Sequence, residues 1–174
     1  MIQPHVPLHA REDDAPEAVV VHTADAAHIE GAKRLADANR EVFSFLTRAA
    51  FEEAWRERAL LVALMEGCVV GFVRYHHRRR DTHTTLYDIC VDEPLRGRGV
   101  GSRMFHCLKD ECRTLGRTVI GLKCPAGARA NAFYVRQGFS LVATLPGKGR
   151  PLRASLENSF SPGQAAGAGV RMTE

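Results

Sequence analysis

The amino-acid sequence predicts one domain of the α/β (α+β) class, with a mixed, mostly antiparallel sheet of six to seven strands flanked by about four helices. The first observation behind this prediction is the order of the elements. Helices and antiparallel strands come first, and a strand-loop-helix unit and a strand-helix-strand unit follow. The second is composition, because 174 residues that are 45% hydrophobic can bury one core but not two comfortable ones.

Both ends of the chain are predicted to lie outside this domain. Residues 1–17 carry three prolines among charged residues and no sustained periodicity, which is typical of a flexible arm. Residues 158–174 form a disordered tail in this interpretation, because their small residues bury too little surface to become ordered. The predicted domain therefore spans residues 18–157.

The first half of the domain is predicted to hold two helices and four strands. Asp25 and Thr47 are residue types that cap helices, and apolar residues recur at helical spacing after each of them. The apolar stripes are Ile29, Ala32, Leu35 and Ala36 in the first helix and Phe51, Ala54 and Trp55 in the second. The predicted strands are 19–21, 60–65, 69–75 and 84–91. Glu66-Gly67 makes a hairpin between the second and third of these strands.

A longer helix, a shorter helix and three strands are predicted in the second half. The longer helix begins near Gly101 and ends before Gly116, a residue that suits a helix C-terminus. Its apolar positions recur at helical spacing and are Met104, Phe105, Leu108, Cys112 and Leu115. The remaining predicted elements are strands at 119–122, 139–144 and 152–156 and a helix at 128–137.

Charge and cysteine content narrow the cellular setting. A formal net charge of +4 is compatible with an anionic ligand or an acidic partner. The five cysteines are odd in number and form no C-x-x-C pair, which indicates free thiols in a reducing compartment. No apolar run approaches the length of about 18 residues that a membrane helix needs, so we expect a cytoplasmic protein without membrane association. Histidine and cysteine spacing matches no structural zinc site, so no metal is expected.

A basic cluster is predicted at the end of the third strand and in the turn that follows. Its members are Arg74, Arg78, Arg79 and Arg80, with His76 and His77 between them. The ordinary interpretation is a solvated strand end. The alternative is a basic rim that contacts an anionic cofactor, nucleic acid or an acidic acceptor.

The segment Arg96-Gly97-Arg98-Gly99-Val100-Gly101 joins an apolar strand to the longer helix. At a helix start several backbone N–H groups lack partners and the macrodipole is positive, so main chain alone can bind anionic oxygens. Glycines permit close approach, and the arginines add charge. A P-loop does not fit, because Ser102-Arg103 replaces its Lys-Ser/Thr pair, and a dinucleotide fingerprint does not fit, because Ser102 replaces its third glycine.

Arg96, Gly99 and Gly101 instead fit the pattern Arg/Gln-x-x-Gly-x-Gly/Ala, which resembles the acyl-CoA pyrophosphate loop of the GNAT acetyltransferases. Two flanking segments carry the same resemblance. Residues 86–94 are similar to the family's fourth strand and following turn, and residues 130–139 to its last helix and the Gly-Phe that opens the next strand. The resemblance implies the GNAT fold, in which the fourth and fifth strands splay apart. It also implies direct attack of a neutral amine on the thioester of acetyl-CoA.

The resemblance implies that loop main chain and the fourth strand hold acetyl-CoA. The implied loop residues are Arg96, Gly97, Arg98, Gly99, Val100, Gly101 and Ser102. The pantetheine arm would pair with the backbone of Ile89, Cys90 and Val91, as an extended chain that carries amides can do at a strand edge. Asn131 and Tyr134 complete the implied set, although the family's asparagine position falls on Gly127 here.

Acetyl transfer requires an oxyanion donor, a base and an acid. A backbone N–H near Val91 is the implied donor. Tyr134 occupies the family's tyrosine position and is the implied acid for the departing thiolate, with core packing as the alternative. Asp88 is the candidate base, with a plain ion pair as the alternative. Glu66 is a second candidate base, and an ordered water chain could replace either carboxylate. An acyl-cysteine route through Cys124 is conceivable, but a buried inert thiol is the simpler interpretation.

The predicted function is therefore an acetyl-CoA-dependent N-acetyltransferase for a primary amine of a small molecule or peptide, working as a monomer or homodimer. One alternative is a non-catalytic acyl-CoA sensor, which the glycine at position 127 permits. Another is a nucleic-acid-associated enzyme that acetylates aminoacyl-tRNA, which the basic cluster permits. Turnover with amines, tight CoA binding without turnover, and salt-dependent RNA binding distinguish the three.

Overall fold

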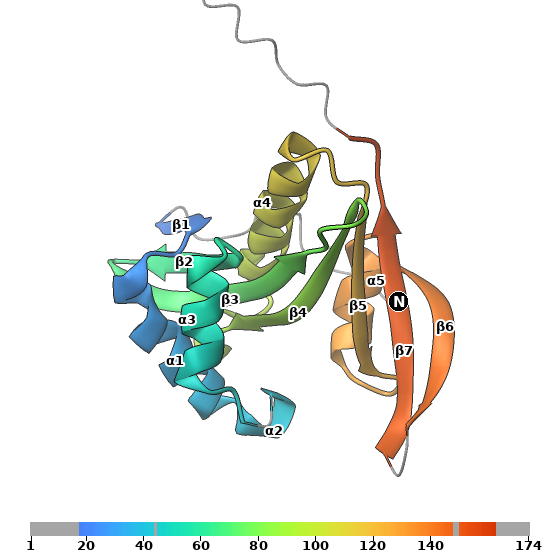
Figure 1. The fold of residues 1–174 in the computed structure, drawn as a ribbon. Coiled ribbons are helices and arrows are strands. Elements are labelled where there is room, and N and C mark those ends of the chain that lie inside the picture. Colours follow the sequence, from blue (N-terminus) through green and yellow to red (C-terminus); the bar gives the residue numbers. More distant parts are fainter. Residues whose placement is uncertain (1–17, 44, 148–149, 163–174) are drawn as a thin grey trace, which may run out of the picture.

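Seven strands form one sheet in the order β1-β2-β3-β4-β5-β7-β6 (Figure 1). The computed structural model describes residues 18–43, 45–147 and 150–162, so the arm predicted at residues 1–17 lies outside the described residues. The strands are β1 (Val19–Thr23), β2 (Leu60–Met65), β3 (Cys68–His77), β4 (His83–Val91), β5 (Val119–Pro125), β6 (Ser140–Gly147) and β7 (Arg150–Ser159). Only the β4–β5 pair is parallel within the described sheet, which confirms the predicted mixed, mostly antiparallel architecture.

Helices cover both faces of the sheet, and a buried apolar cluster lies on each side (Figure 1). The helical elements are the turn η1 (Ala26–His28), α1 (Ile29–Ala38), α2 (Arg40–Phe43), α3 (Arg48–Arg56), the turn η2 (Glu93–Leu95), α4 (Val100–Thr114) and α5 (Ala130–Arg136). Helices α1 and α3 pack on one face, whereas α4 and α5 pack on the other. No helix in the described part of the chain is long and apolar enough to cross a lipid bilayer.

The apolar stripe predicted for the first helix is buried. Its residues, each at most 3% exposed, are Ile29, Ala32, Leu35 and Ala36. Asp25 caps the preceding turn η1 rather than α1 itself, because its carboxylate accepts from the Ala27 N–H at 2.8 Å. Thr47 caps α3 as predicted and accepts from the Ala50 N–H at 3.2 Å. The sequence does not predict α2, because four residues are too few for a periodic signal.

Strands β4 and β5 pair only near their starts. Residues 83–85 of β4 lie opposite residues 119–121 of β5, and the strands diverge beyond this point (Figure 1). This arrangement confirms the splay that the family resemblance implied. One edge of β4 from Leu86 to Val91 therefore has no neighbouring strand among the described elements, although the other edge pairs with β3.

The ordered chain continues beyond residue 157, where the sequence predicted the tail to begin. Strand β7 extends to Ser159, which lies opposite Val119 of β5. Asn158 is 3% exposed, and its Nδ2 donates to the Gln137 carbonyl at 2.7 Å. The predicted boundary was wrong because pairing with a distant strand, rather than local composition, orders this segment. Residues 163–174 of the predicted tail lie outside the described residues.

Phe72 fastens α3 to the sheet, and we expect Phe72→Ala to lower the free energy of unfolding by about 3–5 kcal/mol. The Phe72 ring is 0% exposed and meets Phe51 edge-on, with centroids 5.2 Å apart. Its removal would leave a cavity between α3 and β3. Urea unfolding measures the loss. The control is Phe45→Ala, since Phe45 is 67% exposed. Equal losses in the two variants would contradict this assignment.

Candidate active site

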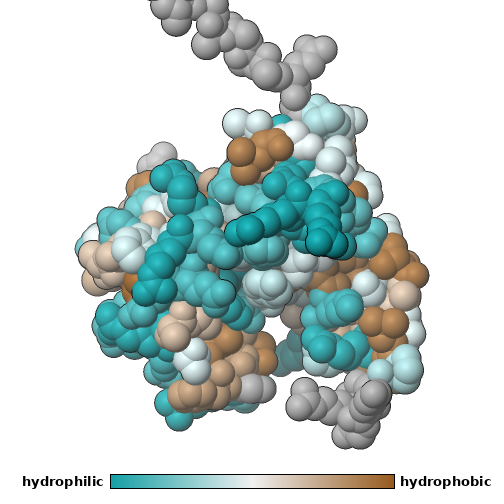
Figure 2. Space-filling model, in the orientation of Figure 1, coloured by the Kyte–Doolittle hydropathy of each residue, from teal (hydrophilic) through white to brown (hydrophobic). Residues whose placement is uncertain are grey.

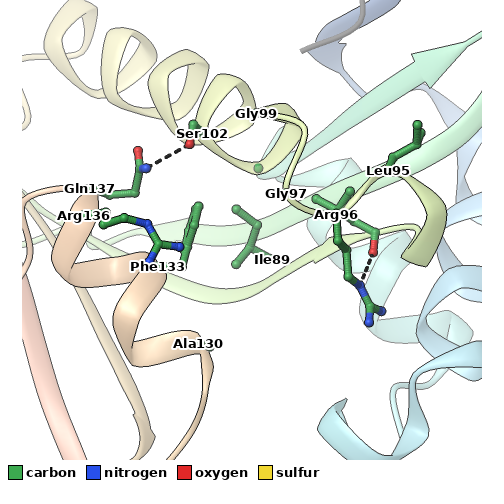
Figure 3. A pocket seen from close by; sticks show the side chains of 12 residues that line it. Ile89, Leu95, Arg96, Gly97, Gly99, Ser102, Ala130, Phe133, Arg136 and Gln137 are labelled. Carbon is green, nitrogen blue, oxygen red and sulfur yellow. Dashed lines mark hydrogen bonds between the residues drawn. The ribbon is translucent and has the colours of Figure 1, made fainter. Parts of the chain in front are cut away.

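A cavity of about 550 Å³ lies between the end of β4, the start of α4 and α5 (Figure 3). Its size falls within the range of about 300–1,000 Å³ that is common for small-molecule sites. The residues around it are Ile89, Val91, Leu95, Arg96, Gly97, Gly99, Gly101, Ser102, Ala130, Phe133, Arg136 and Gln137. Tertiary structure thus places the predicted glycine-rich loop and the predicted strand backbone around one space.

The start of α4 offers unpaired backbone amides at this cavity. Gly97 and Gly99 have φ values of +74° and +77°, the left-handed conformation that favours glycine. The first hydrogen bond of the helix joins the Arg103 N–H to the Gly99 carbonyl at 2.9 Å, so the amides of residues 100–102 lack partners within the helix. These amides and the positive end of the helix dipole can bind diphosphate oxygens.

Gly101 allows the start of α4 to approach α5 closely. A Cβ atom at this position would lie 3.3 Å from the Phe133 ring and 3.6 Å from the Val91 side chain. A larger side chain would displace the Phe133 ring from the cavity wall. The glycine therefore keeps the cavity open between the two helices.

The Arg96 guanidinium binds the protein itself. Its Nε donates to the Val91 carbonyl at 3.1 Å (Figure 3). Its Nη2 donates to Oδ1 of Asn39. Arg98 is exposed and does not line the cavity. The Val100 side chain is buried in the core, so this residue has only its backbone to offer. The loop's contribution comes mainly from its main chain, and the sequence could not assign the arginine side chains.

Strand β4 presents alternate side chains to the two sides of the sheet. Ile89 and Val91 line the cavity on the α4 side. Cys90 packs in the opposite cluster beneath α1 and α3, and burial raises the pKa of its thiol to about 11. Cys90 therefore has a backbone to offer a cofactor but no thiolate.

Tyr134 is 8% exposed and belongs to the core between α5 and the sheet. Its ring meets Phe133 and Phe139 edge-on, with both centroid separations 5.5 Å. Burial raises the pKa of Tyr134, and the neighbouring Cys124 and Asp88 raise it further. The phenol consequently keeps its proton at neutral pH, which is the state that a general acid needs.

Asp88 forms a mostly buried ion pair with Arg74. Its Oδ2 accepts from Arg74 Nε at 2.8 Å and from Nη2 at 2.7 Å. Burial raises the pKa of Asp88, whereas the Arg74 guanidinium opposes that rise. Asp88 therefore forms the plain ion pair that was the alternative to a catalytic role. Its carboxyl group also has the raised pKa that a base would use.

Asn131 fastens the turn between β5 and α5. Its Nδ2 donates to the Ala126 carbonyl at 2.7 Å and to the Pro125 carbonyl at 3.2 Å, and its Oδ1 accepts from the Cys124 thiol at 2.7 Å. The amide predicted to bind cofactor is thus engaged within the protein. Burial raises the pKa of Cys124, so its thiol suits a structural role better than nucleophilic attack.

Sequence reasoning missed one face of α5. Ala130, Phe133, Arg136 and Gln137 line the cavity, and Arg136 extends from α5 beside Phe133 in Figure 3. Gln137 Nε2 donates to Ser102 Oγ at 2.9 Å and so connects α5 to α4. The spacing i, i+3, i+7 was the available signal, because residues so spaced share a helix face. It could not indicate which element that face meets.

Other candidates lie away from the cavity lining. Glu66 occupies the β2–β3 turn with φ of +51°. Within the basic cluster, Arg74 pairs with Asp88 and Arg78 pairs with Asp81, so carboxylates neutralise two of its four arginines. In the described ranges, no three His, Cys, Asp or Glu side chains are grouped as a metal ion would require.

Comparison with known proteins gives a family and a fold. A model of the acetyltransferase (GNAT) family matches residues 29–139. Among solved structures, Ard1 from Thermoplasma volcanium is 24% identical, with 82% of this chain and 97% of that chain covered at a TM-score of 0.73. The ribosomal-protein-S18-alanine N-acetyltransferase from Escherichia coli is 18% identical, with coverages of 85% and 97% and a TM-score of 0.70.

A third structural neighbour is an aminoglycoside 6′-N-acetyltransferase solved with coenzyme A. It is 14% identical, with 83% of this chain and 99% of that chain covered at a TM-score of 0.73. No curated protein sequence matches the chain significantly. At these identities the structural likeness establishes the fold and leaves the acceptor open.

Proposed function

Because the chain belongs to the GNAT family and is an N-acetyltransferase, we propose that it transfers the acetyl group of acetyl-CoA to a primary amine of a small molecule or peptide. One observation carries this proposal. The cavity of about 550 Å³ is bordered both by the unpaired amides at the start of α4 and by the part of β4 from which β5 has diverged. A long cofactor with a diphosphate and an amide-bearing arm matches both features.

In this proposal the diphosphate lies on the amides of residues 100–102. Arg136 supplies positive charge from α5 on the opposite side of the cavity. The pantetheine arm pairs with the β4 edge at residues 89–91, where β5 has diverged. Its thioester then reaches the part of the splay near Tyr134.

The acceptor amine approaches from the other face of the sheet. Asp88 lies on the same side of β4 as Cys90, which faces α1 and α3. Figure 2 shows this face hollowed between the part of the molecule built by α1 to α3 and the part built by β6 and β7. The cofactor thus brings its thioester from one side of the sheet, and the acceptor amine reaches that thioester from the other side, as direct attack requires.

Tyr134 and Asp88 divide the proton transfers between them. The amine nitrogen attacks the thioester carbonyl, and a β4 backbone N–H near Val91 stabilises the oxyanion. Asp88, directly or through water, takes the proton that the amine loses. Tyr134 gives its proton to the departing CoA thiolate and recovers one from solvent.

Thiol release from acetyl-CoA with a panel of amines tests the function. Peptides with free α-amino groups and small polyamines or aminoglycosides should both be included, because the structural neighbours act on acceptors of both kinds. Turnover with one class identifies the acceptor. Tight CoA binding without turnover on any amine would contradict the enzyme and favour the sensor.

We also propose a cytoplasmic location, which the five free cysteines support. Oligomeric state is proposed to be monomer or homodimer. Size-exclusion chromatography with light scattering distinguishes these two states, and a larger assembly would contradict both.

We expect Asp88→Asn to lower kcat about thirtyfold, below the usual range of 10²–10⁴ because water can relay the proton. The base acts only when deprotonated, so wild-type turnover should fall as pH drops through the raised pKa of Asp88. This acid limb should disappear in Asp88→Asn. In the companion variant Arg74→Gln the limb should move to higher pH, because the opposing guanidinium is gone. An unchanged limb in Asp88→Asn would exclude Asp88 as the base.

A further inference from the structure

Asn39 lies between α1 and α2 and connects them to a loop that is 57 residues away in sequence. It ends helix α1, it is 7% exposed, and its Nδ2 donates to the Leu35 carbonyl at 2.8 Å. Its Oδ1 accepts from Nη2 of Arg96 in the glycine-rich loop. Its backbone carbonyl accepts from the N–H groups of Val42 and Phe43 in α2, at 3.0 and 3.2 Å. Every polar group of this buried side chain is therefore engaged.

Arg96 completes the connection to the sheet. The same guanidinium that binds Asn39 donates from Nε to the Val91 carbonyl at the end of β4. Gly97 follows immediately, and the left-handed Gly99 ends the loop at the start of α4. The orientation of the loop amides thus depends on the position of the Arg96 guanidinium, which Asn39 and the Val91 carbonyl hold.

We propose that Asn39 is a positioning residue for cofactor binding: through Arg96 it holds the glycine-rich loop in the conformation that presents its amides to the CoA diphosphate. This inference rests on the proposed function of the cavity. It gives α1 and α2, on the acceptor side of the sheet, a direct connection to the cofactor loop.

The physical reason is the flexibility of the loop. Gly97 and Gly99 have access to many backbone conformations, and fixing each residue costs about 1–2 kcal/mol in conformational entropy. A loop already fixed by the Asn39–Arg96–Val91 hydrogen bonds bears this cost during folding rather than during binding. Loss of the Asn39 oxygen should therefore weaken CoA binding although Asn39 does not line the cavity.

Two substitutions separate this role from a purely helical one. Asn39→Ala removes both side-chain bonds. Asn39→Asp keeps an oxygen for Arg96, now as a carboxylate that pairs with the guanidinium, but loses the donor to the Leu35 carbonyl. The contact with the loop is kept and the helix-end bond is lost. Both variants should have lower melting temperatures. Calorimetry with CoA should give a Kd about tenfold higher for Asn39→Ala, the effect of one hydrogen bond to a charged group, and close to wild type for Asn39→Asp.

A double-mutant cycle tests the route through Arg96. Arg96→Ala should also raise the Kd for CoA, and Asn39→Ala should add nothing further in the Arg96→Ala background, because the two residues act through one bond. Arg96→Lys keeps the charge but cannot form the fork, so it should resemble Arg96→Ala. Lys33→Ala is the control, because it breaks the Lys33–Asp37 pair on α1 without touching the loop.

Several outcomes would overturn the inference. Asn39→Asp could bind CoA as weakly as Asn39→Ala, the effects of the two substitutions could be additive in the double variant, or Lys33→Ala could weaken CoA binding as much as Asn39→Ala. Wild-type protein that binds no CoA would overturn the proposed function first. CoA binding by wild type with unchanged affinity in Asn39→Ala would overturn this inference alone.

Discussion

Gly99→Val should weaken CoA binding by about 100-fold or more, because charge-assisted bonds to the loop amides are each worth about 1.5–3 kcal/mol. Gly99 has φ of +77°, a conformation that β-branched residues scarcely adopt. Valine would therefore turn the loop away from its present path at the cavity that Gly99 lines. Isothermal calorimetry with CoA measures the change.

Gly116→Val is the matched control. Gly116 also has positive φ, at +66°, but follows the other end of α4, and a Cβ atom there meets nothing within 4 Å. It carries similar backbone strain without touching the cavity, so its melting temperature should fall while its CoA affinity stays at the wild-type value. If Gly99→Val bound CoA as tightly as Gly116→Val, the loop would not be the diphosphate site.

Tyr134→Phe should lower kcat by about 1,000-fold, within the usual range of 10²–10⁴ for loss of a general acid. The ring contacts with Phe133 and Phe139 survive the change, so the fold and the CoA affinity should be nearly unaffected. The variant lacks only the phenolic hydroxyl, the group that burial keeps protonated in the wild type. Steady-state thiol release, with calorimetry on the same samples, separates kcat from Kd.

Tyr87→Phe is the control for the loss of a hydroxyl group. Tyr87 lies one residue before Asp88 but is 53% exposed, so the variant should retain wild-type turnover. Wild-type turnover in Tyr134→Phe would remove Tyr134 from the mechanism and leave it a core residue. An equal loss of turnover and CoA affinity would make it a binding residue instead.

The patterned parts of the fold could be predicted from sequence because their signals are local. The buried stripe of α1 follows from the spacing of Ile29, Ala32, Leu35 and Ala36, and α4 follows from the apolar residues at helical spacing after Gly101, one residue after its observed start at Val100. The end of β7 could not be predicted in this way. Asn158 is polar in sequence but buried by β5 and α5, which come from elsewhere in the chain.

The candidate site divides along the same line. The loop glycines and Tyr134 could be selected from their order and spacing, since they lie within one run of about fifty residues that resembles a known family. Arg96 could be named but its role could not be, because its partner Asn39 is 57 residues away in sequence. Asn131 was predicted to bind the cofactor because nothing in the sequence indicates that its amide donates to carbonyls of the β5–α5 turn.

By itself the sequence determined the fold class, the family resemblance and the presence of a glycine-rich helix start, because backbone conformation and hydrophobic periodicity are properties of neighbouring residues. Only the tertiary structure decided which side chains face the cavity, which charges are neutralised and which helices the glycine-rich loop contacts. Those outcomes depend on contacts between distant segments, whose register is set by packing of the whole core.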